Sequence, residues 1–311
     1  NNTGNEGGGG GIFCYNSSPK FYECFIQNNE TDDVGGGLYS RSNSSPEFYN
    51  TVFSGNTAEF GGACYMRDES SPVMENVKMI DNSANNSGGA IVLKDNADLL
   101  ATFSEITGNI TDGLGGGVYI NNADPTFNFS LFANNSSSSG GAAYIRNESY
   151  VSFTNVTIAN NMVGLYGDAI YLRDASYVSM SNSICWQQGS SQIYFRDEGS
   201  EVTLDVVYST FQNGTDGIDE NGNGQINWGN GNIEDNPQFC NDLGGNFSVR
   251  ESSPCVTGGI GQSLMGCFEP GCGPINTGPI WYVDLNGNDV NDGSSELPFE
   301  TINRAISTAD N

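Results

Sequence analysis

A short motif recurs along the first two thirds of the chain, and its spacing constrains the fold more strongly than any other feature. Each copy has a pair of glycines followed by apolar residues and then an aromatic residue or valine, at intervals of about 26 residues. The copies are Gly10-Gly11-Ile12-Phe13, Gly36-Gly37-Leu38-Tyr39, Gly61-Gly62-Ala63-Cys64-Tyr65, Gly88-Gly89-Ala90-Ile91-Val92, Gly116-Gly117-Val118-Tyr119, Gly140-Gly141-Ala142-Ala143-Tyr144, Gly167-Asp168-Ala169-Ile170-Tyr171 and the degenerate Ser191-Gln192-Ile193-Tyr194. The last residues of these copies are predicted to be structurally equivalent.

A second marker runs in phase with the glycine motif. It is an apolar residue three positions before an asparagine, in the pairs Phe25/Asn28, Phe53/Asn56, Met79/Asn82, Ile106/Asn109, Phe132/Asn135 and Ile158/Asn161. Between the two markers, Ser-Pro or Asp-Pro turns precede stretches in which apolar and polar residues alternate. Such alternation is typical of a strand with one buried face. Each repeat is therefore predicted to contain two or three short strands separated by turns.

Repeats of this size cannot bury an apolar face alone, so successive copies must stack on a shared core. The two-residue alternation and the density of glycine and proline exclude a helical solenoid, and leucine is too sparse for leucine-rich repeats. A parallel β-helix with one repeat per coil remains. In it we expect the aromatic row to stack inside, the asparagines to form a ladder at a turn with left-handed backbone, and the glycine pair to make a sharp corner.

Residues 8 to 213 resemble the right-handed β-helix repeats of polymorphic-outer-membrane-protein-type and related secreted bacterial surface proteins. The resemblance rests on the glycine, aromatic and asparagine positions given above. It implies an all-β, right-handed parallel β-helix in an extracellular, secreted or cell-surface protein. We expect the coils to occupy residues 1–214, and because Asn1 to Gly11 have the pattern of the middle of a repeat, we expect a segment excised or matured from a longer polypeptide.

The next stretch, residues 215–272, is irregular and contains four of the eight cysteines. An N-I-x-x-x-P-x-F segment ending at Phe239 and an S-P-C turn ending at Cys255 resemble the ending module of bacterial β-helix proteins. In that setting the implied disulfides are Cys240 with Cys255 and Cys267 with Cys272, although four cysteines allow three connectivities. Without histidine or a C-x-x-C pair, disulfides in an oxidising compartment are favoured over a zinc site.

The four cysteines of the repeats allow two interpretations. They are either disulfide-bonded or buried free thiols that serve as small apolar residues. These are Cys14, Cys24, Cys64 and Cys185.

Residues 281–311 follow a linker rich in glycine and proline at residues 273–280, and they resemble the segment that opens many secreted β-helix domains. In those domains a strand and an acidic glycine loop lead into a short amphipathic helix that caps the open end of the solenoid. Phe299, Ile302, Ala305 and Ile306 repeat with helical spacing, and Pro298 suits the start of a helix. Either a second β-helix follows in the parent chain, or the segment covers the N-terminal coil of a neighbouring copy and propagates a head-to-tail polymer.

Charge and hydropathy exclude two classes of partner. The net charge is −27 and the chain has only 10 Lys and Arg, whereas binding a phosphate backbone depends on clustered basic side chains, so we expect no nucleic acid partner. No apolar run approaches the roughly 18 residues of a spanning helix, so we expect no membrane insertion.

One acidic loop resembles the first half of an EF-hand loop, in which oxygen ligands alternate ahead of a glycine. Asp219, Asn221 and Asn223 are the candidate calcium ligands, but the acid expected at loop position twelve is replaced by Asn230. A solvated acidic loop is the alternative. Calcium is the one cofactor that the sequence suggests, and otherwise we expect none.

The composition argues against catalysis. Without histidine, neither Ser-His nor Cys-His nucleophile pairs can be built. Enzymes on β-helices use aligned acids, and acids do align here, but each follows a basic residue, which favours an exposed ladder of charge over an acid pair that hydrolyses carbohydrate. The acids are Asp68, Asp95, Asp174 and Asp197, and the basic row contains Arg41, Arg67, Lys94, Arg146 and Arg173. We therefore expect that the chain has no catalytic residues and is not an enzyme.

Sequons of the form Asn-x-Ser/Thr are dense, which makes glycosylation plausible in a surface protein. The candidates are Asn16, Asn29, Asn43, Asn85, Asn109, Asn128, Asn135, Asn147, Asn155, Asn213 and Asn246. Together these features predict an extracellular structural protein, a subunit or tandem segment of a surface filament, layer or adhesin assembled head-to-tail, with copies of itself and surface glycans as partners. The alternative is a carbohydrate-active β-helix enzyme, lyase or hydrolase, or a carbohydrate-binding module.

Overall fold

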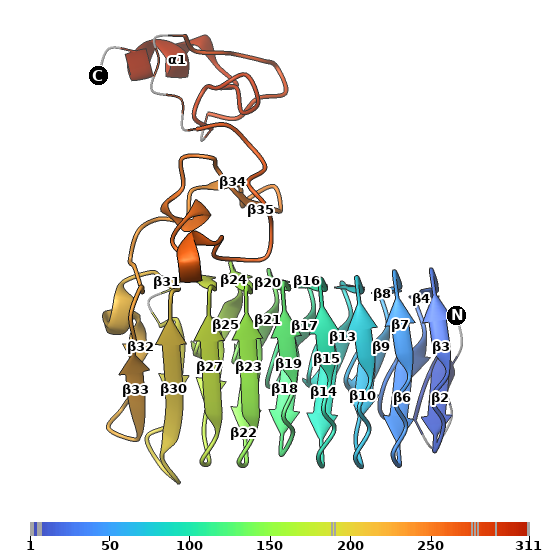
Figure 1. The fold of residues 1–311 in the computed structure, drawn as a ribbon. Coiled ribbons are helices and arrows are strands. Elements are labelled where there is room, and N and C mark those ends of the chain that lie inside the picture. The colour runs from blue at the N-terminus through green and yellow to red at the C-terminus, as the bar shows by residue number, and fades with distance from the viewer. Residues whose placement is uncertain are drawn as a thin grey trace.

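The computed structural model describes residues 3–4, 8–187, 189, 191–274, 276, 278, 280–289 and 291–309. Most of them form a right-handed parallel β-solenoid with about 26 residues per turn, followed by a small disulfide-linked module and a C-terminal segment with one α-helix. The strands lie in rows along the solenoid axis, and the N-terminus is at one end (Figure 1). The predicted all-β, right-handed parallel β-helix with a short C-terminal helix is therefore confirmed.

Four parallel sheets form the solenoid, so a complete coil has four strands where the sequence predicted two or three. Sheet B contains β2 (Ile12–Tyr15), β6 (Leu38–Arg41), β10 (Cys64–Met66), β14 (Ile91–Lys94), β18 (Val118–Asn121), β22 (Ala143–Arg146), β26 (Ile170–Leu172), β29 (Ile193–Phe195) and β32 (Ile218–Asp219). Sheet C contains β3 (Lys20–Tyr22), β7 (Glu47–Tyr49), β11 (Val73–Glu75), β15 (Leu100–Thr102), β19 (Thr126–Asn128), β23 (Tyr150–Thr154), β27 (Tyr177–Ser181), β30 (Val202–Val207) and β33 (Gly224–Trp228).

The other two sheets complete each coil. Sheet D contains β4 (Phe25–Gln27), β8 (Val52–Ser54), β12 (Lys78–Ile80), β16 (Glu105–Thr107), β20 (Leu131–Ala133), β24 (Thr157–Ala159), β28 (Ile184–Trp186) and β31 (Thr210–Phe211). Sheet A contains β1 (Thr3–Gly4), β5 (Glu30–Thr31), β9 (Thr57–Phe60), β13 (Ser83–Ser87), β17 (Ile110–Thr111), β21 (Ser136–Ser139) and β25 (Met162–Tyr166). We number the coils by their sheet-B strand, so coil 1 begins at β2, coil 6 at β22 and coil 7 at β26.

A left-handed residue stands at each of the four corners of a coil, and glycine, asparagine and aspartate supply most of these residues. In coil 3 the corners have positive φ at Gly61, at Asp68 with Glu69, at Asn76 and at Asp81. Residues with short polar side chains or none adopt this region most readily. A Cβ at Gly61 would also overlap the carbonyl of Cys64, so the predicted glycine corner is confirmed.

The lumen of the solenoid is filled by inward side chains from sheets B, C and D, and the rows of sheets C and D contain most of its aromatic rings. Phe127 and Phe132 face one another across coil 5 with ring centroids 5.0 Å apart, and Phe153 of the next coil stacks on Phe127 at 5.4 Å. Each buried ring contributes roughly 2–3 kcal/mol of hydrophobic stabilisation. The rows contain Phe48, Met74, Ala101, Phe127, Phe153, Met180 and Val206 in sheet C, and Ile26, Phe53, Met79, Ile106, Phe132, Ile158, Cys185 and Phe211 in sheet D.

The aromatic row of the glycine motif is aligned as predicted, but the prediction that it stacks inside is wrong. Tyr39 pairs with Tyr65 across the ladder, and the row continues without a break from Phe13 to Tyr194. Its neighbours Cys64 and Met66 point into the lumen, so Tyr65 points to the other side of sheet B. There the tyrosines form a separate cluster with Val34 and Phe60. These two residues belong to what we call the sheet-A arm, the part of each coil that contains its sheet-A strand.

The asparagine ladder is the second predicted row, and the structure corrects two of its details. From Asn29 to Asn135 each ladder amide donates to the next asparagine, as from Asn56 Nδ2 to Asn82 Oδ1 at 2.9 Å, and the same Oδ1 also accepts the backbone N–H of the donor residue. In coil 1 the buried ladder residue is Asn29, while Asn28 is exposed. The left-handed residue is the one before the ladder position, such as Asp81, because it turns the chain inward.

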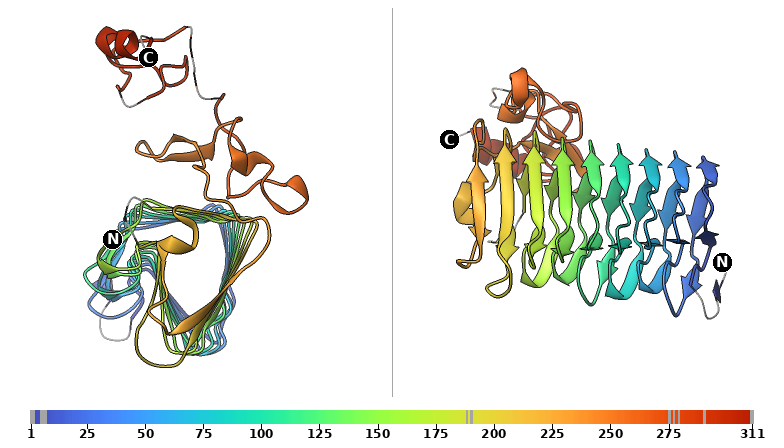
Figure 2. Two further views of the ribbon diagram at one scale, coloured as in Figure 1. Left: turned by 90° about the vertical axis from the view of Figure 1, so that its left-hand side faces the viewer. Right: turned by 60° about the horizontal axis from the view of Figure 1, so that its bottom comes forward.

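The C-terminal module has a different architecture. After the 3-10 helix η1 (Gly214–Gly217), it contains the antiparallel pair β34 (Phe239–Asn241) and β35 (Asn246–Val249), followed by η2 (Pro254–Val256) and η3 (Ile260–Gln262). It packs on the outer face of sheet D in coils 5 to 7 and hydrogen-bonds to Asn155 and Asn182. Figure 2 shows this module lying against one side of the solenoid, with α1 (Ile302–Ala309) beyond it.

The disulfide of the module differs from the implied pairing. Cys240 is bonded to Cys272, with Cα atoms 5.9 Å apart, whereas Cys255 and Cys267 are free. The reason is packing, because Cys255 lies in an apolar cluster with Met265, and Cys267 sits against the outer face of sheet D. The repeat cysteines are also free, and three of the four are buried as small apolar residues.

Candidate functional site

The turn between sheets B and C carries the predicted ladder of charge. Arg67 Nε lies 3.0 Å from Asp68 Oδ1, and Arg41 of the preceding coil lies 3.6 Å from Asp68. The same pattern recurs where Arg173 and Arg146 both pair with Asp174. Asp68 and Asp174 are thus held beside guanidinium groups of their own and the preceding coil, and Asp95 lies 3.9 Å from Arg67 of the preceding coil. Such exposed pairs contribute at most about 1 kcal/mol each.

This pairing bears on the carbohydrate-hydrolysis alternative. A pair of acids that exchange a proton needs environments that push their two pKa values apart. Asp68 and Asp174 instead each lie beside two arginines, one from the same coil and one from the preceding coil. The exposed, stacked rings of Phe103 and Phe129 are not beside these acids, because they lie at the opposite corner of sheet C. The predicted absence of catalytic residues stays a prediction.

The two phenylalanines at the corner between sheets C and D are a feature that the sequence analysis missed. Phe103 and Phe129 have φ values of 53° and 48°, at positions where Asn50, Asn76 and Asn155 stand in other coils. Bulky residues rarely adopt this backbone conformation. The sequence did contain a signal for this feature, because the two phenylalanines replace asparagines that stand at the same position in other coils.

The acidic loop proposed for calcium lies at the last coil of the solenoid. Asn221 Nδ2 donates to the carbonyl of Phe195 at 2.7 Å, and Asn223 Nδ2 donates to the carbonyl of Arg196 at 2.6 Å. These bonds give both amides a structural role as rungs on the preceding coil, while Asp219 continues the row of the glycine motif beyond Tyr194. In the described part of the chain, no three His, Cys, Asp or Glu side chains gather where an ion could be held. The calcium site stays a prediction.

Burial divides the glycosylation candidates. The Nδ2 atoms of Asn29, Asn109 and Asn135 are donors inside the buried ladder, and that of Asn155 donates to Leu264 at 2.8 Å. A glycan on any of these four nitrogens is incompatible with the folded chain, so these candidates are corrected. The remaining seven are exposed or partly exposed, and their modification stays a prediction: Asn16, Asn43, Asn85, Asn128, Asn147, Asn213 and Asn246.

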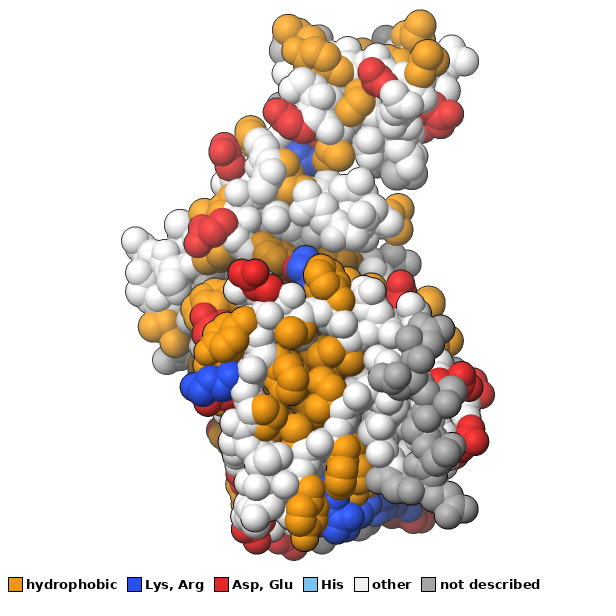
Figure 3. All heavy atoms as spheres, turned by 90° about the vertical axis from the view of Figure 1, so that its right-hand side faces the viewer, with side chains coloured by type: hydrophobic (Ala, Val, Ile, Leu, Met, Phe, Trp, Pro, Cys, Tyr) orange, Lys and Arg blue, Asp and Glu red, His pale blue; other side chains and the backbone are white. Residues whose placement is uncertain are grey.

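The end of the solenoid that carries coil 1 presents an apolar surface. We call it the end face and define it by the outer edges of β2, β3 and β4, each of which pairs with only one other strand in the described chain. Ile12 and Phe21 pack against the core from one side, and Phe13 and Phe25 are exposed. Figure 3 shows hydrophobic side chains gathered in the middle of this end.

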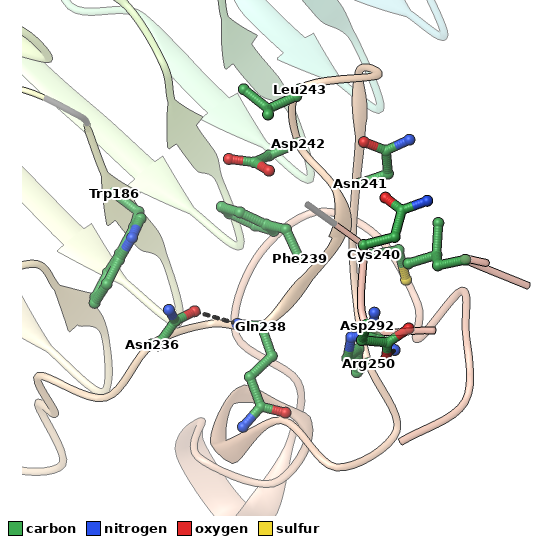
Figure 4. A pocket seen from close by; sticks show the side chains of 12 residues that line it. Trp186, Asn236, Gln238, Phe239, Cys240, Asn241, Asp242, Leu243, Arg250 and Asp292 are labelled. Atoms are coloured by element: carbon green, nitrogen blue, oxygen red, sulfur yellow. Dashed lines mark hydrogen bonds and ion pairs between the residues drawn. The ribbon is translucent and has the colours of Figure 1, made fainter. Parts of the chain in front are cut away.

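The C-terminal segment offers a second apolar surface. Helix α1 buries none of its residues in the structure, and Ile302 and Ile306 on one helical face are 67% and 55% exposed. The segment is joined to the module by Arg250, which pairs with Asp292 at 2.9 Å and donates to the carbonyls of Gly273 and Pro274. Figure 4 shows this pair on one side of a cavity of about 350 Å³, with Trp186 of the solenoid on the other.

Among the described residues, none belongs to a helix that could span a bilayer. No curated protein and no solved structure matches the chain. The family model described as right handed beta helix region matches residues 1–136 and 90–253. The matched residues cover every coil of the solenoid and continue into the module. The chain, with its stacked coils and its asparagine ladder, therefore belongs to the right-handed β-helix family.

Proposed function

We propose that the chain is a non-catalytic structural segment of an extracellular assembly in which β-helices are joined end to end. The end face of coil 1 carries this proposal. It combines the unpaired edges of three parallel strands with apolar side chains that continue the core rows. Unpaired strand edges beside exposed apolar groups are templates for further pairing.

The chemistry of the end face selects its partner. Phe21 stacks on Phe48 at 4.7 Å, and Ile26 pairs with Phe53, so in the described part of the chain coil 1 contacts the rows from one side only. A surface of another β-helix segment with apolar side chains at matching positions satisfies this arrangement. The contact is the same whether it is made by another copy or by a neighbouring segment of one polypeptide.

Helix α1 and the loop before it are the part of this chain that we assign to the contact. Ile302, Ala305 and Ile306 lie at helical spacing on one face, and the structure leaves that face uncovered. An amphipathic helix needs an apolar partner to bury its stripe. Placing α1 of one copy over the end face of the next gives a heterologous contact that propagates.

Two further observations support an extracellular, structural role. The Cys240–Cys272 disulfide suits an oxidising compartment. The ion pairs of Asp68 and Asp174 are arranged to stabilise turns, which favours a shaft over an enzyme.

The test is a complementation experiment on the full chain. An end-face variant, Ile12→Glu with Phe13→Glu, leaves α1 intact, and a helix variant, Ile302→Lys with Ile306→Lys, leaves the end face intact. We expect the unmodified chain to form end-to-end strings in electron micrographs and to gain mass with concentration in light scattering. Each variant alone should be monomeric, and an equal mixture of the two should stop at dimers, because only one competent contact remains per pair.

A matched control places the same charges elsewhere. Leu100→Glu with Ile110→Glu changes two exposed apolar residues of coil 4 and should leave the strings intact. Isolated particles of the unmodified chain at every concentration would show that its ends do not join. Strings that survive in either single variant would assign the contact to other surfaces.

A further inference from the structure

Coil 7 lacks the sheet-A strand that the earlier complete coils have, as far as the chain is described. In coil 6, six residues, 162–167, connect ladder residue Asn161 to Asp168. In coil 7 only three, 188–190, connect the equivalent Gln187 and Ser191. Two hydrogen bonds set this equivalence. The backbone N–H of Asn161 donates to Gln187 Oε1, and the backbone N–H of Asp168 donates to the carbonyl of Ser191. The shorter connection leaves β25 as the edge of sheet A.

The edge strand β25 is apolar and exposed. Met162 and Leu165 are 62% and 65% exposed, and Tyr166 is stacked on Tyr194 of coil 8. Natural edge strands are usually blunted by charged residues or proline. The sequence of β25, MVGLY, has neither. It therefore has the properties of strands to which an extended peptide adds by main-chain pairing.

A pocket of about 390 Å³ lies beside this edge. Met162 and Val163 of β25 line it together with Leu243, from the turn of the β34–β35 hairpin. Two carboxylates, Asp168 and Asp242, face the same space. Apolar walls with acidic groups match a long basic side chain, whose methylenes pack on apolar residues while its cation meets the carboxylate.

Asp168 occupies a position at which the earlier copies of the motif have glycine. Its counterparts include Gly62, Gly89 and Gly141. The carboxylate fits because residue 189 is also glycine, and a Cβ there would overlap it. The pocket thus depends on two residues together. Asp168 adds a carboxylate at the end of coil 6, and Gly189 of coil 7 leaves room for it.

The carboxylate of Asp168 is half-buried and forms no ion pair with a Lys or Arg of the described chain. Desolvation raises its pKa, although a backbone hydrogen bond from Ser191 opposes this. Burial therefore disfavours the charged form of the carboxylate, and a cation in the pocket would stabilise that form.

From these observations we propose that β25 and the adjoining pocket form a docking site for an extended peptide segment of another protein, which adds to sheet A as a strand and places a lysine or arginine against Asp168. A second copy of this chain is a poor source of that cation. Eight of its ten Lys and Arg residues are already engaged in ion pairs.

The probe is a library of random nine-residue peptides displayed on phage and selected on the immobilised full chain. We expect enriched sequences with β-branched residues at alternate positions and one invariant basic residue. Synthetic versions should bind at least tenfold more weakly to Asp168→Asn, and at least tenfold more weakly when the basic residue is replaced by norleucine. Val163→Lys, which puts a charge on the edge, should abolish binding.

The matched control is Asp112→Asn, an exposed acid in the sheet-A arm of coil 4, which should leave the dissociation constant unchanged. Circular dichroism melting confirms that each variant is folded before binding is measured. The proposal is overturned if selection on the unmodified chain enriches no sequence beyond those enriched on the Val163→Lys variant. It is also overturned if the enriched peptides lack a basic residue, or if the Asp168→Asn variant binds them as tightly as the unmodified chain does. Concentration-dependent dimers of the unmodified chain that Val163→Lys abolishes would assign β25 to a second copy instead.

Discussion

Coils 2 to 6 and coil 7 are built on the same plan, yet they do different things. In coils 2 to 6 each ladder position is asparagine, each coil has a sheet-A strand, and equivalent residues are 25 to 27 positions apart. In coil 7 the ladder position is Gln187, and the interval from Tyr171 to Tyr194 falls to 23 residues. Regular coils stabilise the shaft, whereas the irregular coil creates an exposed edge and a pocket.

The difference teaches where function is to be sought in a solenoid. A residue that repeats is explained by its neighbours above and below, as Asn82 is by Asn56 and Asn109. A residue that breaks its row has no such explanation. Asp168 is the clearest case, because its glycine counterparts satisfy the fold without a side chain.

The largest effect is expected from emptying the lumen of a regular coil. Phe132 is fully buried and touches both Phe127 and Phe153, so Phe132→Ala should lower the free energy of unfolding by about 4 kcal/mol. Phe129, three residues earlier, is exposed, so Phe129→Ala is the matched control and should change it by about 1 kcal/mol or less. Urea unfolding followed by circular dichroism measures both. Similar losses in the two variants would contradict the assignment of inside and outside.

Breaking the amide ladder should come next. Asn109 accepts from both the backbone and side chain of Asn82 and donates to Asn135 and to the carbonyl of Met79. Asn109→Ala leaves several buried groups unpaired and should cost about 3 kcal/mol. Asn85→Ala, on the exposed arm of coil 3, removes one surface bond to Glu59 and should be nearly neutral. Equal stability of the two variants would show that the ladder adds nothing to the shaft.

The fold could be predicted from the sequence because its evidence is repeated. The row from Phe13 to Tyr194 supplied eight samples of one position, so a degenerate copy did not obscure the register. Which side of sheet B the row faces could not be read from the pattern. Tyr65 is as buried as its inward neighbours, because the sheet-A arm covers it, and two faces with apolar residues look alike in sequence.

Single events were much harder to predict. The Cys240–Cys272 bond depends on how one irregular module folds, and no second copy of that module exists in the sequence to reveal its contacts. The pocket at Asp168 depends on the shorter coil 7, a signal present in the spacing but visible only when the missing strand is placed in space. The sequons at Asn109 and Asn135 suggested glycosylation, but these asparagines are present because they form the buried ladder.

The module and the shaft should respond differently to loss of the disulfide. Cys272→Ser opens a link between residues 32 positions apart, which in the chain-entropy view stabilises the module by about 3–4 kcal/mol. Hydrogen exchange should rise in β34 and β35 while the ladder amides of coils 2 to 6 stay protected. Cys24→Ser, at a free and partly exposed cysteine, is the control and should alter neither region. Unfolding of both regions together would instead make the module part of the shaft.

The smallest expected effect tests coil 7 itself. Desolvation raises the pKa of Asp168, so the folded state binds a proton there more tightly than the unfolded state does. The resulting destabilisation is absent below the ordinary pKa of an aspartate, grows as pH rises toward the raised folded pKa, and is fully present above it. Asp168→Asn should therefore melt slightly above the unmodified chain at pH 7 and together with it near pH 3, in contrast to Asp112→Asn, which should show no such difference. A lower melting temperature for Asp168→Asn at pH 7 would mean that the carboxylate stabilises the coil, and the unfavourable anion that gives the pocket its affinity for a cation would not exist.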